Sequence, residues 1–278
     1  MLGFTAAMDR TVLVTGAGTG IGPATMVELA RRGFDAVGGV RSPAKARAVT
    51  RAARKAAVKV RTITLDVTSP AQCEDAIASL KPFGLVNNAG ISAGGAIEDV
   101  SDEDARLALE TMVLALARLA RLAIPHMRAH GGGRIVNISS IYGLMTTPLT
   151  GWYQAAKHAL EALSDALRVE VASDGIAVVL IEPGAFRSNI WESAGNDLQR
   201  RIVSDYFAAY RRLEEGIKAS QRLMGDPIDV ARVIASVMTA KSPKARYLVG
   251  YDARAIDIYS KVLPTEVRDR LARLTLGL

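Results

Sequence analysis

The most constraining feature of this sequence is a glycine-rich turn that directly follows a short apolar run. Residues 11–15 are typical of a β-strand, and Gly16, Gly18, Gly20 and Gly22 follow before a segment of helical composition. Glycines allow a tight turn and let backbone N–H groups approach a pyrophosphate at a helix N-terminus. A strand, a glycine turn and a helix in this order predict a dinucleotide-binding unit.

The spacing of these glycines departs from G-x-G-x-x-G, because Ile21 stands where the third glycine would be. It fits T-G-x-x-x-G-x-G, which begins at Thr15. A glycine-rich turn alone can be a simple loop, so the prediction depends on the α/β pattern around it. Within the turn we expect the cofactor to contact four residues, Gly16, Thr19, Gly20 and Ile21.

Short apolar runs alternate with longer amphipathic segments along the chain. We predict strands at residues 11–15, 36–40, 60–65, 85–87, 134–138, 176–181 and 247–249. We predict helices at residues 24–32, 44–56, 102–130 and 153–173. Repeated strand and helix order implies parallel pairing, and strands of nearly continuous Val, Ile and Leu imply helices on both faces. The expected fold class is α/β, with a Rossmann-type doubly wound parallel sheet.

One domain is the simplest organisation for this chain. Its residues are 49% hydrophobic and 23% charged, which suits a packed core. No linker, repeat or low-complexity tract interrupts the first 185 residues. We therefore expect residues 1–278 to form a single dinucleotide-binding domain. The pattern loosens after Pro183, and we interpret residues from about 185 to 225 as a C-terminal substrate lid, with a final helix and strand beyond it.

Charge and cysteine content exclude several kinds of partner. Basic residues exceed acidic ones by 35 to 28, which permits an anionic partner, but no basic tract is interleaved with aromatic residues as nucleic-acid binding would require. Cys73 is the only cysteine, so the chain cannot form an intrachain disulfide or a cysteine-cluster metal site. His126, His130 and His158 are not spaced as ligands. We expect neither nucleic acid nor metal as a partner.

The sequence also indicates the compartment. Residues 1–10 lack the basic start and apolar run of an export signal, so we expect no signal peptide. The longest stretch without a charge, residues 135–156, contains polar residues, glycine and proline that do not suit a lipid-facing helix. We therefore expect a cytoplasmic protein with no membrane span.

Arg41 bears on the choice of cofactor. It follows the second predicted strand, where a dinucleotide fold places the residue that contacts the adenosine ribose. An acidic residue would bind a free 2′-hydroxyl, whereas a guanidinium pairs with a 2′-phosphate. NADP(H) is therefore predicted in preference to NAD(H), which stays an alternative. The structural alternative places Arg41, beside Ser42 and Pro43, at a solvated helix start.

Several short motifs follow one another in a fixed order. Besides the turn at residues 15–22, they are Leu65-Asp66-Val67-Thr68, Asn87-Asn88-Ala89-Gly90, Ser140 with Tyr153-x-x-x-Lys157, and Pro183-Gly184 followed by Ser188. In order and spacing the chain resembles the classical short-chain dehydrogenase/reductase family, from about residue 11 to residue 188. Each motif is weak alone, and their agreement carries the resemblance.

The resemblance implies cofactor contacts beyond the turn. It implies that Asp66, followed by Val67, lies beside the adenine, and that Asn88, Ala89 and Gly90 line the cofactor. The loop that closes on the nicotinamide would contain Pro183, Gly184 and Ser188. For Asn87 we favour a structural role, because asparagine amides commonly tie neighbouring backbone together.

The resemblance also implies the catalytic residues. Tyr153 and Lys157 are four residues apart in a helical segment and share one face. Hydride transfer to a carbonyl leaves negative charge on oxygen, and a phenol can donate the proton required there. We expect Tyr153 to be the general acid/base, and Lys157 to lower the pKa of Tyr153 and hold the ribose. By family spacing, Ser140 binds the substrate oxygen and Ser139 is its structural neighbour.

One expected residue is absent. The family usually carries an asparagine in the helix before residues 124–127, where it helps to hold a water that links the lysine to solvent. Met112 stands there, and no asparagine occurs between Asn88 and Asn137. A thioether is at best a weak acceptor. The alternatives are that another group, such as backbone or Thr111, holds the water, or that turnover is slow.

The predicted function is an NADP(H)-dependent oxidoreductase that interconverts an alcohol and a ketone or aldehyde. A hydrophobic substrate, steroid-like or retinoid-like, fits apolar residues that could line a pocket: Leu144, Met145, Leu149, Phe186, Ile190, Trp191, Tyr206, Phe207 and Tyr210. The alternative is a cofactor-responsive binding or regulatory protein with weak or no turnover. By resemblance we expect a homodimer or homotetramer formed through residues 102–127 and the helix of Tyr153.

Overall fold

A parallel sheet forms the centre of the computed structural model, which describes residues 10–200 and 203–278. Its strands run in the order β3-β2-β1-β4-β5-β6-β7. They are β1 (Thr11–Val14), β2 (Asp35–Val40), β3 (Arg61–Thr64), β4 (Gly84–Asn87), β5 (Gly133–Ile138), β6 (Ile176–Pro183) and β7 (Arg246–Val249). All seven predicted strands are confirmed within two residues at each end, and so is the α/β doubly wound class.

Helices connect successive strands and continue after the last one. They are α1 (Ile21–Arg31), α2 (Pro43–Lys55), α3 (Pro70–Leu80), α4 (Asp102–Leu109), α5 (Ala115–Ala129), α6 (Gly151–Glu170), α7 (Ile190–Gln199), α8 (Phe207–Ser220), α9 (Pro227–Thr239), α10 (Tyr251–Val262) and α11 (Thr265–Leu276). The predicted helix at residues 102–130 is present, but a π-helical segment, η2 (Glu110–Leu114), joins α4 to α5.

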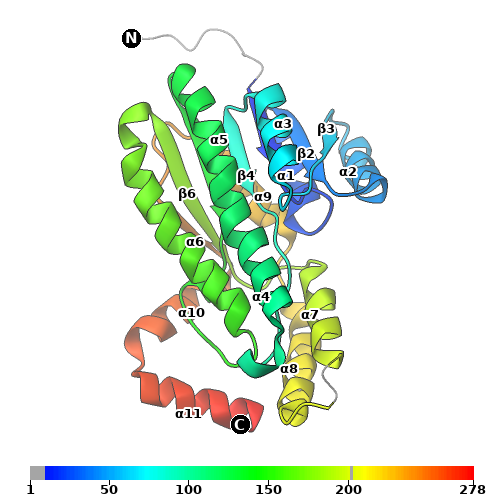
Figure 1. The fold of residues 1–278 in the computed structure, drawn as a ribbon, viewed down its shortest axis with the longest axis vertical. Helices are drawn as coiled ribbons and strands as arrows, with labels where there is room; N and C mark the ends of the chain where they lie inside the picture. The colour runs from blue at the N-terminus through cyan, green and yellow to red at the C-terminus, as the bar shows by residue number, and fades with distance from the viewer. Residues whose placement is uncertain (1–9, 201–202) are drawn as a thin grey trace.

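Helices cover the two faces of the sheet (Figure 1), and the core lies in two layers, one on each face. Val12 and Val14 of β1 face a core that includes residues of α1, α2 and α9, whereas Leu13 faces a core with residues of α3, α5 and α6. Successive side chains of a strand point to opposite faces, so a strand covered on both sides must be apolar throughout. This requirement explains the uninterrupted apolar runs of the sequence.

Several helix starts are specified locally. Ser42 and Ser69 accept hydrogen bonds from the backbone N–H groups of Lys45 and Gln72, and a proline opens each of the two helices, α2 and α3. These residues satisfy amides that a helix start leaves unpaired. By contrast, α1 begins after Gly20 without a side-chain cap. Among its first N–H groups, that of Gly22 donates to the Thr19 carbonyl at 3.1 Å, and the start of the helix faces the space beyond the carboxyl end of β1.

The order of the strands places the predicted site. β1 lies between β2 and β4, so the chain moves outward in opposite directions from the centre of the sheet. Ligands of open α/β sheets bind outside the carboxyl ends of the strands at such a point. The glycine turn, Asn88 and Ser140 follow β1, β4 and β5 at this edge.

The segment after β6 forms one end of the molecule. Figure 1 shows α7 and α8 at the same end as α10 and α11, and α11 contacts α8. Residues 201–202 of the expected lid lie outside the described residues, as do residues 1–9, where we expect no export signal. None of the described helices is both long and apolar enough to span a bilayer.

Candidate active site

The glycine turn is shaped by close backbone packing. Gly20 has a φ of +57°, which an L side chain rarely adopts, and it immediately precedes α1. A methyl group on Gly22 would lie 2.6 Å from both Ala17 Cα and the Gly16 carbonyl oxygen. The first turn of α1 therefore packs directly on the loop. Its uncapped N–H groups and the helix dipole fit the pyrophosphate of a dinucleotide.

Asn88 holds the glycine turn in place from the neighbouring strand. Its side-chain amide donates to the carbonyl oxygens of Thr15 and Gly16, at 3.0 and 3.1 Å. In return, the Thr15 hydroxyl accepts from the backbone N–H groups of Asn88 and Ala89, both at 3.0 Å. The amide of Asn88 thus positions the turn, while Gly90 is exposed beside it.

Asn87 has the structural role expected for it. Its amide donates to Asn137 Oδ1 at 2.8 Å, and the Asn137 amide donates to Ser164 Oγ at 2.8 Å. Asn87 and Asn137 are buried, and together with Ser164 they tie β4 and β5 to α6. This chain fixes the helix that carries Tyr153 and Lys157 against the sheet.

Asp66 and Val67 lie at the far side of the same sheet edge, beyond β3. The Asp66 carboxylate accepts from the N–H and hydroxyl of Thr68 at 3.0 and 2.8 Å, which forms a tight turn. Val67 is buried, and its carbonyl accepts from Cys73 Sγ and from Arg118. The structure thus gives both residues a local structural role at the place where the adenine is expected.

Arg41 lies at the carboxyl end of β2, where the sequence predicted it. The guanidinium is exposed and forms no salt bridge within the described part of the chain. Lys45, which the sequence analysis missed, is also exposed and lies close to the glycine turn. A methyl group on Gly18 would lie 2.6 Å from Lys45 Cβ. Two cations therefore flank the expected ribose position.

Ser140 and Tyr153 come together from different elements. Ser140 follows β5, is buried, and its hydroxyl accepts from the Tyr142 N–H at 3.2 Å. Tyr153, in the first turn of α6, interacts with the Ser140 hydroxyl, and this hydrogen bond lowers the pKa of Tyr153. The ring of Tyr142 packs edge-on against that of Tyr153, with 6.2 Å between centroids.

Lys157 lies behind this pair. It is buried, its ammonium donates to the Ile138 carbonyl at 2.8 Å, and its Nζ lies 5.6 Å from the centre of the Tyr153 ring. Burial lowers the pKa of Lys157 to about 8, and the nearby Glu161 carboxylate opposes that change.

Burial is the largest influence on the pKa of Tyr153, and the expected lowering of this pKa by Lys157 stays a prediction. Burial raises the pKa of Tyr153 to about 12, and the hydrogen bond with Ser140 opposes the rise. The Lys157 ammonium is directed at the Ile138 carbonyl, and burial disfavours its own charge. The neutral phenol, which can donate a proton, is therefore the favoured form of Tyr153.

The loop after β6 reaches the glycine turn. Pro183 ends β6, and the Gly184 N–H donates to the Val249 carbonyl at 2.9 Å. Ser188 packs against Gly20, where an added methyl group would lie 2.9 Å from Ser188 Cβ. The structure thus brings Ser188 to the turn, although 168 residues separate it from Gly20 in the sequence.

A cavity of about 740 Å³ extends from the glycine turn to α7 and α8. Its lining includes Gly20 and Ser188, together with Trp191, Ile217 and Met224. Charged side chains also line it: Lys218 and Glu214 pair with each other at 2.6 Å, and Arg187 pairs at 2.8 Å with Asp226, which does not line the cavity. Neither Ser140 nor Tyr153 is among the lining residues.

The expected apolar wall is only partly formed by the residues that the sequence suggested. Trp191 lines the cavity, but Leu149, Phe186 and Tyr210 are buried in the core. The Tyr210 hydroxyl accepts from the Ala96 N–H at 2.7 Å, which gives this aromatic residue a structural role. In the sequence, the apolar character of these residues did not distinguish those that line a pocket from those that pack in the core.

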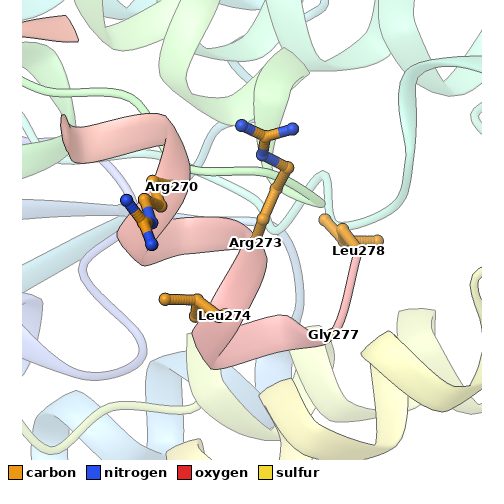
Figure 2. A pocket seen from close by; sticks show the side chains of 5 residues that line it. All are labelled: Arg270, Arg273, Leu274, Gly277 and Leu278. Carbon is orange, nitrogen blue, oxygen red and sulfur yellow. The ribbon is translucent and has the colours of Figure 1, made fainter. Parts of the chain in front are cut away.

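A second cavity, of about 460 Å³, lies at the carboxyl end of α11. Figure 2 shows the residues that line it, Arg270, Arg273, Leu274, Gly277 and Leu278. None of them belongs to the predicted site. Among the described residues no group of three or more His, Cys, Asp or Glu could hold a metal ion, and the expected absence of a metal stays a prediction.

Met112 lies inside the π-helical segment that interrupts the α4 to α5 helix. It is fully buried and packs with Ala108 and Ala156. A methyl group on Gly90 would lie 3.8 Å from its sulfur. Met112 therefore closes this side of the site with an apolar group, and a π-helical segment at this point is typical of a functional site.

The comparisons with known proteins agree with this arrangement. The short chain dehydrogenase family matches residues 10–199, and the chain belongs to this family of oxidoreductases. The oxidoreductase YusZ of Bacillus subtilis is 33% identical over 264 residues, which are 92% of this chain and 94% of that protein.

Two further relatives are informative. The NADPH-dependent 3-dehydrocapnine reductase of Ornithobacterium rhinotracheale is 31% identical over 94% of this chain and 95% of its own. A solved structure of an actinorhodin polyketide ketoreductase variant with NADPH is 27% identical. It has a TM-score of 0.74 and covers 86% of this chain and 95% of its own.

Proposed function

We propose that this protein is an NADP(H)-dependent oxidoreductase that interconverts an alcohol and a ketone or aldehyde. The observation that carries the proposal is the convergence of Ser140, Tyr153 and Lys157 at the edge of the sheet that also holds the glycine turn. A neutral phenol beside a hydroxyl and backed by an ammonium can supply a proton where a carbonyl oxygen gains charge.

Residues on several strands would hold the cofactor. The N–H groups at the start of α1 and the turn at Gly16, Thr19, Gly20 and Ile21 would bind the pyrophosphate. Asp66 and Val67 would lie by the adenine, and Asn88, Ala89 and Gly90 would border the ribose and nicotinamide. Lys157 would hold the ribose, and Pro183, Gly184 and Ser188 would cover the nicotinamide. When bound, the nicotinamide supplies or accepts the hydride.

The preference for NADP(H) rests on Arg41 and Lys45. Both are exposed cations beside the carboxyl end of β2, and no carboxylate ends that strand. A guanidinium and an ammonium would bind a 2′-phosphate by charge-assisted hydrogen bonds. The relatives whose names or structures include NADPH support the same preference.

Within the site, each catalytic side chain would have one task. Ser140 would donate to the substrate oxygen, and Tyr153 would donate its proton to that oxygen in reduction and remove it in oxidation. The ammonium of Lys157 would stabilise the negative charge left on Tyr153 after donation. Burial raises the pKa of Tyr153 to about 12, so the proton is present on the phenol across the neutral range.

A hydrophobic substrate is proposed, with residues from about 185 to 225 as its lid. Trp191, Ile217 and Met224 give the cavity beside Ser188 an apolar wall, and its volume suits a small molecule. The ion pairs Lys218–Glu214 and Arg187–Asp226 neutralise charges around it. The apolar body of an alcohol or carbonyl compound would lie there, while Ser140 and Tyr153, which do not line this cavity, would bind its oxygen.

Assembly as a homodimer or homotetramer is proposed through α4, α5 and α6. Large apolar side chains are exposed on α4, on α6 and on the π-helical segment that leads into α5: Leu107, Leu114, Leu163 and Val169. Burying such side chains between two copies would remove apolar surface from water. Light scattering after size-exclusion chromatography measures the assembly state.

The proposed activity is tested with a panel of carbonyl compounds and alcohols, followed by the absorbance of NADPH. Turnover of at least one substrate class, with cofactor binding measured separately by calorimetry, is the expected result. Cofactor binding without turnover of any member of a broad panel would favour a binding or regulatory protein instead. Met112 is the observation that keeps this second function in consideration.

A further inference from the structure

Helix α6 carries a line of ionisable side chains that continues beyond the proposed catalytic pair. Tyr153, Lys157, Glu161 and Asp165 stand at every fourth position and so lie on one side of the helix. Lys157 and Glu161 are buried, and the carboxylate of Asp165 is 41% exposed. The line therefore runs from the site to solvent.

Glu161 also contacts the turn that carries Ser140. A methyl group on Gly143 would lie 3.1 Å from Glu161 Oε1 and 2.7 Å from Ser139 Oγ. Gly143 in turn donates its N–H to the Ser140 carbonyl at 2.8 Å. The Glu161 carboxylate thus packs against the turn of Ser140, and it stands one helical turn from Lys157, on whose charge it acts.

Around Glu161, carboxylates outnumber the cations that pair with them. Arg246, on β7, contacts Glu161 at 3.1 Å, binds both oxygens of Asp165, and has its Nε 3.1 Å from Glu182. Glu161 and Glu182 are buried. Asp165 also pairs with Arg168 at 2.9 Å, so three carboxylates face two guanidinium groups, and Lys157 stands one turn from Glu161 on α6.

On the side of the π-helical segment, the residues around the site are apolar. Met112 and Ala156 close the site with apolar atoms on the side of the π-helical segment. Within the described part of the chain, the ionisable groups recorded near the lysine are Tyr153, whose ring centre lies 5.6 Å from Nζ, and Glu161. Around Glu161 itself they are Arg246, Asp165 and Glu182, on β7, α6 and β6.

We propose that Glu161 is a positioning residue for this active site, which keeps Lys157 in its ammonium form and fixes the turn of Ser140. Without the carboxylate, burial would favour the neutral amine, which cannot stabilise a charged Tyr153. The inference rests on the proposed function only for its effect on turnover, because the protonation of Lys157 can be measured without any substrate.

The test follows the 13Cε NMR signal of Lys157 against pH in protein labelled at lysine, with the signal assigned by its loss in Lys157→Arg. In the unchanged protein we expect a titration midpoint at about 8. Glu161→Gln keeps the size of the side chain but removes its charge. Its midpoint should move to lower pH by about one unit, because an opposite charge nearby has been removed.

Two variants separate this effect from a purely structural one. Glu161→Asp keeps the charge, and its titration midpoint should lie close to that of the unchanged protein. Asp165→Asn removes a carboxylate from the same Arg246 cluster, one turn further from Lys157, and should leave the midpoint unchanged. An unchanged midpoint in Glu161→Gln, or an equal movement in Asp165→Asn, would overturn the proposal.

The pH profile of kcat/KM for reduction provides a second readout. Lys157 must carry its proton to act, so the decline at alkaline pH should begin at lower pH in Glu161→Gln than in the unchanged protein. Asp165→Asn should keep the original profile, even where it lowers stability. If no substrate is turned over by any form, the proposed function fails, and the NMR midpoints alone decide the role of Glu161.

Discussion

The side chain of Lys45 lies directly over Gly18, so that a methyl group on this glycine would lie 2.6 Å from Lys45 Cβ. This contact joins the first turn of α2 to the glycine turn after β1. Ser42 fixes the contact, because its hydroxyl accepts the Lys45 N–H and caps the helix. The aliphatic part of the Lys45 side chain is thereby held against the glycine turn, close to the end of β2 where Arg41 stands.

Arg41 and Lys45 should decide between the two cofactors. Arg41→Ala is expected to weaken NADPH binding by about tenfold or more, with little effect on NADH, because only NADPH offers a 2′-phosphate to the guanidinium. Lys45→Ala should act in the same direction. Arg47→Ala, which removes an exposed arginine from the same helix, is the matched control. Calorimetric titration measures all three, and an equal loss for both cofactors would refute the assignment.

Lys157 should reduce stability at neutral pH. Burial lowers its folded-state pKa to about 8 from 10.5. Between these values the unfolded chain binds the proton more strongly, so this lysine makes the free energy of unfolding rise with pH. Lys157→Met should raise the free energy of unfolding at pH 7 by about 1 to 3 kcal/mol, and raise it less at pH 10.

Urea denaturation at pH 7 and pH 10 measures this difference. The exposed Lys241→Met is the control and should stay within about 0.5 kcal/mol of the unchanged protein. A Lys157→Met protein that is less stable at pH 7 would show that the hydrogen bond to Ile138 outweighs the cost of burying the charge.

Met112 is expected to act through packing. Met112→Asn places an amide among Ala108, Ala156 and Gly90, and should lower the free energy of unfolding by about 1 to 3 kcal/mol. Met112→Leu conserves volume and should cost less than about 1.5 kcal/mol. Turnover of the folded Asn variant should not increase, because in our proposal Glu161 already keeps Lys157 in its ammonium form. A faster Asn variant of normal stability would instead indicate a limiting water relay on this side.

The strands and central helices were predictable because the buried sheet imposes a strong pattern. A strand such as β1 faces two cores, so Val12, Leu13 and Val14 must all be apolar, and this requirement is visible without a structure. The helices α10 and α11 were missed for the opposite reason. Val267, Leu271 and Leu274 of α11 are exposed, so the spacing of its apolar residues does not correspond to a face packed on the core.

The site was predictable in its residue types and less so in its electrostatics. Spacing alone places Tyr153 and Lys157 on one helical face, and motif order places Ser140 near them. The raised pKa of Tyr153 depends on burial, and the contact of Lys45 with the glycine turn depends on how α2 packs. The π-helical conformation at Met112 likewise has no local sequence signal in this chain.

The central claim is that Tyr153 transfers the proton, and replacing its hydroxyl tests this claim most directly. Tyr153→Phe keeps the ring beside Lys157 but removes the proton, whereas Tyr142→Phe removes the hydroxyl of the ring packed edge-on against it. The measurement is NADPH-dependent reduction of the best substrate, with NADPH affinity determined on the same samples. We predict a loss of turnover of about 1,000-fold or more in Tyr153→Phe with nearly unchanged NADPH binding, and a change of only a few-fold in Tyr142→Phe. Comparable turnover in Tyr153→Phe and the unchanged protein would contradict the account.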